Sequence, residues 1–269
     1  MSLQPSALLK PRQTIENFNK QFESTIENLN PEALFKKVIG LEVQKRIITS
    51  AIYSKDPVHI ILIGPPGNGK TLFLECIQEA FAQHSQWIDS TTSSGIGMVE
   101  RIIEKVKRLR FLLVDELEKF NMNDRTTLLR LLSSGKLSRD LKEVSVELTN
   151  LKIWFVSTCN NIDKIKKQQP EFLDRCLVIK IPELDKEMFY FVASKRLLRE
   201  KGIHSEEIAR YIAGRVYEDL GDETNMRKCI RLARMSYARA IETREDDTIT
   251  KDIVDEVVVD IKMTVHTFD

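Results

Sequence analysis

The stretch Gly64-Pro65-Pro66-Gly67-Asn68-Gly69-Lys70-Thr71 decides the fold of this chain. It matches the pattern G-x-x-x-x-G-K-[ST] and lies between an apolar run, 58–63, and a segment, 71–83, with apolar residues at helical spacing. Glycines let such a loop curl so that its backbone N–H groups point at phosphate oxygens, and the positive end of the following helix adds to the attraction. The pattern predicts a strand, a phosphate-binding loop and a helix.

Two residues at the end of this loop have separate expected roles. Lys70 would reach the β- and γ-phosphates, and the Thr71 hydroxyl would hold Mg²⁺. The expected nucleotide contacts are Gly64, Pro65, Pro66, Gly67, Asn68, Gly69, Lys70, Thr71 and Leu72. Guanine-reading enzymes carry N-K-x-D, whereas the nearest stretch here, 160–163, lacks the lysine. We therefore expect the nucleotide to be ATP.

A second acidic site follows the apolar run Phe111-Leu112-Leu113-Val114. The run predicts a buried strand, and Asp115 and Glu116 emerge at its carboxyl end, where ligands bind in open α/β sheets. Asp115 is expected to orient Mg²⁺, and Glu116 to act as the general base on the attacking water. A solvated acidic turn is the alternative reading of this pair. The adjacent glutamate favours hydrolysis over transfer of phosphate to a small molecule.

The arrangement of the segments predicts an α/β fold. Apolar strands alternate with helices up to about residue 183, which implies a mostly parallel sheet covered on both faces. From Asp185 onward only helices are expected, with caps at Asp185, Ser205, Thr224 and Thr250. The sequence predicts a polar arm or helix at 1–32, a P-loop αβα nucleotide-binding domain at 33–183 and a small all-α lid at 184–269.

Bulk composition argues against several classes of protein, although it does not exclude DNA binding, because a local basic stripe could serve inside a ring. The net charge of +1 gives no whole-surface field for nucleic acid or acidic membranes. The four cysteines lie far apart, so free buried thiols are expected rather than disulfides or a zinc site. The longest apolar runs have strand length, and no signal peptide is recognisable. We expect a cytoplasmic protein with no membrane contact.

With these residues in place, the chain resembles an AAA+ ATPase from about residue 35 to 261. The stretch 35–40, with Val38 and Ile39, resembles the segment that packs against adenine in that family. Residues 64–71 and 115–116 resemble its two Walker motifs. The stretch 154–160 resembles the sensor-1 strand, and the resemblance gives Asn160 the role of orienting the attacking water, with Asn161 as the alternative.

The same resemblance assigns two arginines. The string Pro170-Glu171-Phe172-Leu173-Asp174-Arg175 resembles the stretch with the arginine finger, which reaches the γ-phosphate of a neighbouring subunit. Arg175 therefore implies self-association into a ring, and a hexamer is the family expectation. Arg227 resembles sensor 2 and is the expected nucleotide contact from the lid, ahead of Arg231. Ordinary surface arginines are the alternative reading for both positions.

An insertion between the second Walker motif and the sensor-1 strand narrows the resemblance. Val144, Val146 and Leu148 alternate with polar residues, which predicts one strand of a hairpin. This resembles the pre-sensor-1 hairpin group of AAA+ proteins, which includes the RuvB-like branch-migration motors and the Lon and MoxR types. We expect Lys136, Arg139 and Lys142 to touch DNA, or a partner bound to it, if the hairpin serves a DNA motor.

Three functions remain open from the sequence. The first is a DNA-remodelling motor of the branch-migration or helicase type. The second is a MoxR-like chaperone that remodels proteins. The third is a regulatory switch that signals by nucleotide state, although intact Glu116, Asn160 and Arg175 argue against it. The segment 90–98 is the expected first pore loop; it lacks an aromatic residue, and Ile96 and Met98 are its candidate substitutes for gripping a polypeptide.

Overall fold

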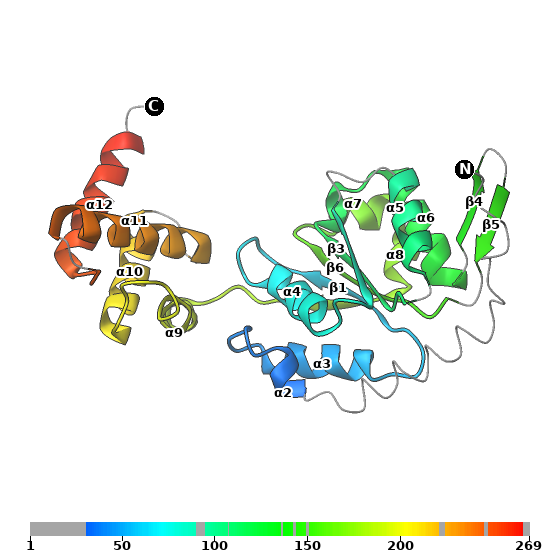
Figure 1. Cartoon of the computed structure of the whole chain (residues 1–269), viewed down its shortest axis with the longest axis horizontal. Coiled ribbons are helices and arrows are strands. Elements are labelled where there is room, and N and C mark those ends of the chain that lie inside the picture. The colour runs from blue at the N-terminus through cyan, green and yellow to red at the C-terminus, as the bar shows by residue number, and fades with distance from the viewer. Residues whose placement is uncertain are drawn as a thin grey trace, which may run out of the picture. The chain divides into compact units, whose positions relative to one another are not determined.

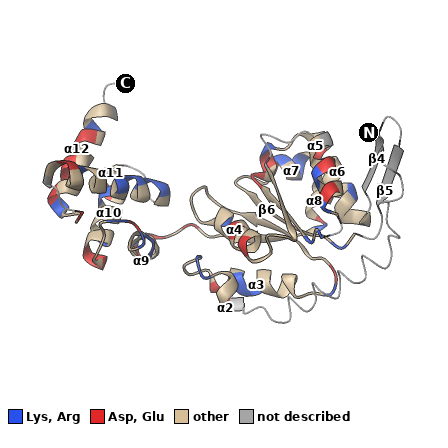
Figure 2. Cartoon of the chain, in the orientation of Figure 1, with Lys and Arg blue, Asp and Glu red and all other residues tan. Residues whose placement is uncertain are grey.

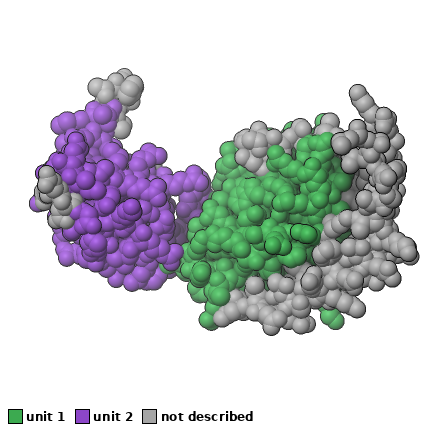
Figure 3. Space-filling view, viewed as in Figure 1, with its two compact units in different colours: residues 1–64, 70–181 green, residues 65–69, 182–269 purple. Residues whose placement is uncertain are grey.

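A computed structural model describes residues 31–89, 95–106, 108–135, 137–141, 144–148, 151–220, 224–244 and 247–265. The chain divides into two compact units, one of residues 1–64 with 70–181 and one of residues 65–69 with 182–269 (Figure 3). The loop 65–69 is thus grouped with the C-terminal helices rather than with the sheet. The expected arm at 1–32 lies outside the described residues except for its last two, and the three-segment division of the chain stays a prediction.

The first unit contains a five-stranded sheet in the order β2-β3-β6-β1-β7 (Figure 1). Its strands are β1 His59–Ile63, β2 Ser85–Asp89, β3 Phe111–Asp115, β6 Trp154–Cys159 and β7 Cys176–Lys180. Every neighbouring pair is parallel. Parallel strands are buried on both faces, which explains why β1 and β3 read as apolar runs. This confirms the predicted αβα sandwich.

Helices cover both faces of the sheet (Figure 1). They are α2 Pro31–Leu34, α3 Glu42–Ile52, α4 Lys70–Ala80, α5 Gly95–Lys105, α6 Met122–Ser134, α7 Asp163–Gln168 and α8 Pro170–Leu173, with the 3₁₀ turn η2 Leu117–Lys119. Alternate residues of each strand feed two separate cores. One core lies under α2, α3 and α4 and contains Phe35 and Phe73, and the other lies under α5 to α8 and contains Phe155 and Phe172.

The expected hairpin is present as β4 Leu137–Leu141 and β5 Val144–Leu148, paired antiparallel as a two-stranded sheet of its own. The strand predicted from the alternation at 144–148 is confirmed. Of the three basic residues expected there, Lys136 and Lys142 lie outside the described residues. Arg139 lies on β4, opposite Val146.

The second unit is helical after residue 182, which confirms the predicted all-α lid. Its helices are α9 Lys186–Leu197, α10 Glu206–Asp219, α11 Met226–Arg244 and α12 Lys251–Val265. Asp185 and Ser205 cap α9 and α10 as expected, since their side chains accept from the N–H groups of Met188 and Ile208. The third cap was predicted wrongly. Asn225, not Thr224, accepts from the N–H of Lys228, because α11 begins one residue later than expected.

Two further expectations need correction. Met98 is fully buried in the core under α5, a helix that begins at Gly95 rather than at Met98, so Met98 does not belong to a pore loop. Residues 90–94 and the side chain of Ile96 lie outside the described part of the chain. All four cysteines are free, but only Cys76, Cys159 and Cys229 are buried, and Cys176 is half-buried.

In the described part of the chain, charged residues are concentrated on the helices (Figure 2). Strands β1 and β6 contain no charged residue, whereas α11 carries a row of arginines. None of the described helices is both long and apolar enough to cross a membrane. The cytoplasmic location stays a prediction.

Candidate nucleotide and hydrolysis site

The phosphate loop begins where β1 ends, at a glycine that the packing requires. A Cβ on Gly64 would lie 2.5 Å from the backbone oxygen of Ile181. No real Cβ approaches a backbone atom so closely, so no other residue fits without moving the backbone. Gly67 and Gly69 have φ angles of +87° and +82°, a region that side chains disfavour. The three glycines are therefore a requirement of loop geometry.

Lys70 opens α4 and folds back toward the loop. It is 5% exposed, and its Nζ donates to the backbone oxygen of Gly64 at 2.7 Å. A neutral carbonyl oxygen compensates only part of the free energy that a buried ammonium group loses by leaving water. A negatively charged phosphate would compensate more of it. Asn68 is also buried, and its Nδ2 donates to the backbone oxygen of Pro182 at 3.1 Å. Leu72, on α4, is half-buried and packs against the core under this helix.

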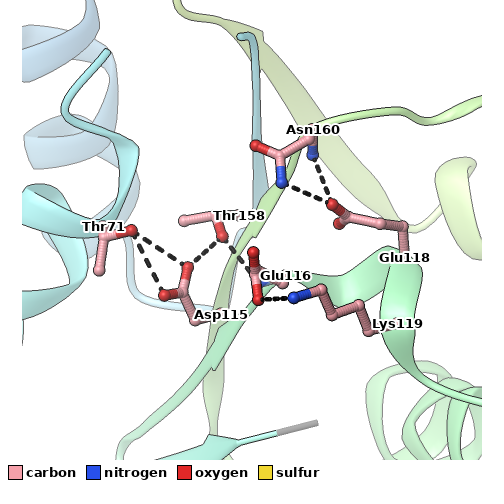
Figure 4. Close-up of polar contacts among 7 residues, drawn as sticks. All are labelled: Thr71, Asp115, Glu116, Glu118, Lys119, Thr158 and Asn160. Atoms are coloured by element: carbon pink, nitrogen blue, oxygen red, sulfur yellow. Dashed lines mark hydrogen bonds and ion pairs between the residues drawn. The ribbon is translucent and has the colours of Figure 1, made fainter. Parts of the chain in front are cut away.

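Thr71 and Asp115 meet across the sheet edge, as the sequence predicts (Figure 4). The hydroxyl of Thr71 lies 3.3 Å from both carboxylate oxygens of Asp115. A hydroxyl and a carboxylate are hard oxygen donors of the kind Mg²⁺ prefers. The residues present therefore fit the expected cation.

Thr158 connects the two acidic residues to the neighbouring strand. Its hydroxyl donates to Oδ1 of Asp115 and accepts from the backbone N–H of Glu116 at 2.9 Å. Thr158 is 1% exposed, and both bonds are partly buried. One side chain on β6 thus fixes the carboxylate of Asp115 and the backbone of Glu116 together (Figure 4).

Glu116 has a backbone conformation that non-glycine residues rarely adopt. Its φ and ψ are 54° and 55°, the left-handed region, which costs about 1–2 kcal/mol for a residue with a side chain. Such strain persists only where the surroundings hold it, and it concentrates at functional sites. The carboxylate Oε2 forms an ion pair with Lys119, one turn further on, and this bond raises the pKa of Lys119. The conformation directs Glu116 away from the continuing strand.

Asn160 lies at the end of β6 and is held by Glu118. The Oε1 atom of Glu118 accepts from the backbone N–H of Asn160 at 3.1 Å and from its side-chain Nδ2 at 2.8 Å. Asn161, the alternative residue, makes a different contact: its Oδ1 accepts from the backbone N–H of Asp163 at 2.7 Å. The geometry favours Asn160 for the sensor role.

Arg175 follows α8, immediately before β7, and is exposed. Its guanidinium forms no hydrogen bond or ion pair with any residue that the structure describes. The side chain is therefore available to a ligand outside its own subunit. A finger role for Arg175 stays a prediction.

Arg125 joins the second Walker motif to the segment that leads to Arg175. It lies on α6, is fully buried, and donates to the backbone oxygen of Phe120 at 2.8 Å and to Oε1 of Gln169 at 2.9 Å. A further bond reaches the side chain of Gln168. Burial lowers the pKa of this guanidinium. Arg125 was not predicted from the sequence, because nothing in the stretch 121–134 marks one arginine of an amphipathic helix as internal.

The remaining expected contacts occupy different surroundings. Val38 is 6% exposed and packs into the core beside Phe35, while Ile39 is half-buried. Arg227 and Arg231 are exposed on α11, and neither pairs with another described side chain. Arg234 on the same helix pairs with Glu200 at 3.0 Å. Arg227 belongs to the second unit, and its nucleotide contact stays a prediction, as does adenine packing on Val38 and Ile39.

Comparison with known proteins identifies the class of this domain. Residues 60–182 match the family described as "ATPase family associated with various cellular activities (AAA)". The matched segment runs from β1 through β7 and includes the phosphate loop, Asp115, Glu116 and Asn160. The chain therefore carries an AAA+ ATPase domain. No curated protein matches the sequence.

Solved structures share the fold across most of the chain. A Thermotoga maritima RuvB variant matches with a TM-score of 0.62 and 19% identity, covering 87% of this chain and 73% of that one. The Thermotoga maritima RuvB Holliday junction branch migration motor matches at 0.56 and 17%, covering 91% and 68%. Hsp104 of S. cerevisiae, in a complex with casein, matches at 0.62 and 14%, covering 90% and 50%. The domain thus resembles RuvB in fold, and Hsp104 shares that fold.

Proposed function

We propose that this chain hydrolyses ATP as one subunit of a ring and couples the reaction to the remodelling of DNA. The observation that supports hydrolysis is the cluster formed by Thr71, Asp115 and Thr158, with Glu116 and Asn160 at the ends of the same two strands. Phosphate-binding, cation-binding and base functions thus meet at one edge of the sheet. A phosphate loop alone would suit a kinase or a GTPase equally well.

The binding part of the reaction falls to the loop and α4. Backbone N–H groups of residues 64–69 and the ammonium of Lys70 would hold the phosphates of ATP. Thr71 and Asp115 would hold Mg²⁺, which neutralises charge on the phosphates when it is bound. Thr158 keeps the carboxylate of Asp115 in position through its hydroxyl.

The chemical step falls to Glu116 and Asn160. Glu116 would accept a proton from a water molecule while the water oxygen attacks the γ-phosphorus. The bond between the γ-phosphorus and the oxygen of the β-phosphate then breaks, which releases ADP and phosphate. Asn160 would orient that water with its amide. The carboxylate of Glu116 must leave Lys119 to act as the base, and Lys119 is exposed enough to swing into solvent.

Arg175 would complete the site of a neighbouring subunit. An exposed guanidinium without a partner among the described residues suits the γ-phosphate of another copy, and such a cation contributes on the order of 10³-fold or more to the rate. A finger that acts on a neighbour's site requires self-association, and a ring would give every site a finger from the next subunit. A hexamer is the family expectation.

The choice of DNA rests on the resemblance to the branch migration motor and on the hairpin β4–β5. Remodelling of polypeptide is the second candidate. It is supported by the likeness to Hsp104 in its casein complex and by a net charge of only +1, which provides no general attraction for DNA.

Steady-state ATP hydrolysis distinguishes these functions. We would measure it with no addition, with four-way DNA, with forked DNA and with unfolded casein, using Glu116→Gln as the blank. Stimulation by DNA that falls as salt rises supports the DNA motor, and stimulation by casein supports the second candidate. Equal rates in all arms would refute coupling to either polymer, and turnover retained in Glu116→Gln would refute the base role.

The role of Arg175 in a neighbour's site has its own test. Arg175→Ala should lose at least about 100-fold in rate, whereas Arg130→Ala, at another exposed arginine of the same unit, should not. Mixing Arg175→Ala with Lys70→Ala subunits should restore activity, because the second variant supplies fingers and the first supplies intact loops. Failure of the mixture to exceed either variant alone would refute action between subunits.

A further inference from the structure

The turn after β3 carries a glutamate for which the proposed mechanism has no use. Glu118 lies in η2, two residues beyond Glu116, and its Oε1 accepts both hydrogen bonds from Asn160. Its Oε2 is buried and has no hydrogen-bond partner in the described part of the chain. A buried carboxylate oxygen without a partner is costly, so the position of Glu118 calls for an explanation beyond packing.

The chemistry of a carboxylate determines the orientation of the amide beside it. An ionised carboxylate only accepts hydrogen bonds, so Asn160 must turn its NH₂ group toward Glu118. The backbone N–H of Asn160 donates to the same oxygen, which fixes the position of the residue relative to Glu118. The amide oxygen of Asn160 then points away from Glu118 (Figure 4) and is free to accept from water. Without Glu118 both orientations of the amide would be possible.

We propose that Glu118 is a positioning residue that fixes the orientation of the Asn160 amide for the attacking water. This rests on the proposed ATP hydrolysis. The clamp links adjacent strands, since Glu118 follows β3 and Asn160 ends β6, and the two strands pair in parallel. The same turn carries Lys119, the partner of Glu116. One short turn therefore controls both the base and the residue that orients the water.

A second residue of β6 lies close to the Glu118 side chain. Cys159, next to Asn160, has its pKa raised to about 12 by burial and by the charge of Glu118. The Cys159 thiol donates to the backbone oxygen of Asn161 at 3.2 Å. Glu118 forms no ion pair with a cation among the described residues, and its neighbour Lys119 pairs with Glu116 instead.

Kinetics of the full chain test this role. Glu118→Ala should lower kcat by about 10–100-fold, as for other partners that orient a functional side chain, with KM for ATP changed by less than about threefold. Glu118→Gln should lose less kcat than Glu118→Ala, because the amide oxygen of the glutamine can still accept a hydrogen bond from Asn160. It should still lose some kcat, because the NH₂ group of the glutamine can also donate to a flipped Asn160 amide. Glu104→Ala, at an exposed glutamate on α5, is the matched control and should match wild type.

A double-mutant cycle separates positioning from a structural effect. If Glu118 acts through Asn160, the double variant Glu118→Ala with Asn160→Ala should have the kcat of Asn160→Ala within about twofold. Multiplied losses, a change in KM alone, or an unchanged kcat in Glu118→Ala would each overturn the proposal.

A measurement independent of turnover keeps the inference distinct from the proposed function. The side-chain NH₂ signal of Asn160, identified by its loss in Asn160→Ala, should be protected from exchange in wild type and lose protection in Glu118→Ala. Unchanged protection would overturn the positioning role even for a chain without ATPase activity. Loss of protection in a chain with no turnover would refute the proposed hydrolysis and leave the contact established.

Discussion

Replacement of Gly64 by alanine tests whether the end of β1 is as tightly enclosed as the structure shows. The new Cβ would lie 2.5 Å from the oxygen of Ile181 and 3.2 Å from its Cβ. That oxygen belongs to backbone, and the N–H of the same residue bonds to the oxygen of Ile63 at 2.7 Å. The neighbour therefore cannot move without breaking the junction between β1 and the chain that follows β7.

The expected cost follows from this clash. Overpacking against a fixed neighbour costs about 1–3 kcal/mol, and a backbone neighbour places Gly64→Ala near the upper end. For a unit of this size, 1 kcal/mol corresponds to roughly 2–4 °C, so the midpoint should fall by about 5–10 °C. Gly40→Ala, in the same unit, is the matched control. It has open space at its Cβ and a φ of +68°, so it carries only the backbone strain of about 1–2 kcal/mol.

Tryptophan fluorescence reports this unit alone. The chain has two tryptophans, Trp87 on β2 and Trp154 on β6, both within the sheet. Urea and thermal unfolding followed at these residues should show Gly64→Ala less stable than Gly40→Ala by about 1 kcal/mol. Equal stabilities, or Gly64→Ala within about 0.5 kcal/mol of wild type, would refute the steric argument.

Three further predictions use the same unit. Thr158→Val should lower the free energy of unfolding in urea by about 2 kcal/mol, because the N–H of Glu116 loses its acceptor. Thr158→Ser should keep most of the stability, and equal losses in the two variants would contradict the role of the hydroxyl. Arg125→Ala should cost about 3 kcal/mol, because it leaves a cavity and removes the donor to Gln169; a loss below about 1 kcal/mol would contradict this. With a pKa of about 12, the Cys159 thiol is ionised in only about one molecule in ten thousand near pH 8, so iodoacetamide should not modify it before urea is added, as mass spectrometry would show.

The sheet was predictable because two features of the sequence mark its clearest strands, namely an apolar run and recognisable residues at the end of that run. Strands β1 and β3 are buried on both faces and are therefore solidly apolar, and each ends in residues with recognisable chemistry. Strand β7 is weaker in this respect: it lies at the edge of the sheet, and Leu177 and Val178 are about 40% exposed. Its apolar run alone marks it as a strand. The helices α7 and α8 were not predicted, since six and four residues give too little periodicity.

Residues of the site were predictable where a motif fixes their spacing from the loop or the strand end. Lys70, Thr71 and Asp115 are of this kind, and the structure brings Thr71 and Asp115 together across a separation of 44 residues. Thr158 was within a recognised stretch but received no role. A polar residue in a strand that is buried at every position is the signal that would have marked it, because such a hydroxyl must find partners inside the protein.

Glu118 shows why the rest of the site could not be predicted. In the sequence it is one of two glutamates flanking Leu117, and surface turns commonly contain such charges. Its role depends on the left-handed conformation of Glu116, which sends the chain into a 3₁₀ turn instead of continuing the strand. Only then does the side chain two residues later reach back over the end of β6 to Asn160. A local backbone conformation thus separates the carboxylate that we propose as the base from the carboxylate that holds the amide. The two neighbouring glutamates are distinguished by geometry that their spacing does not encode.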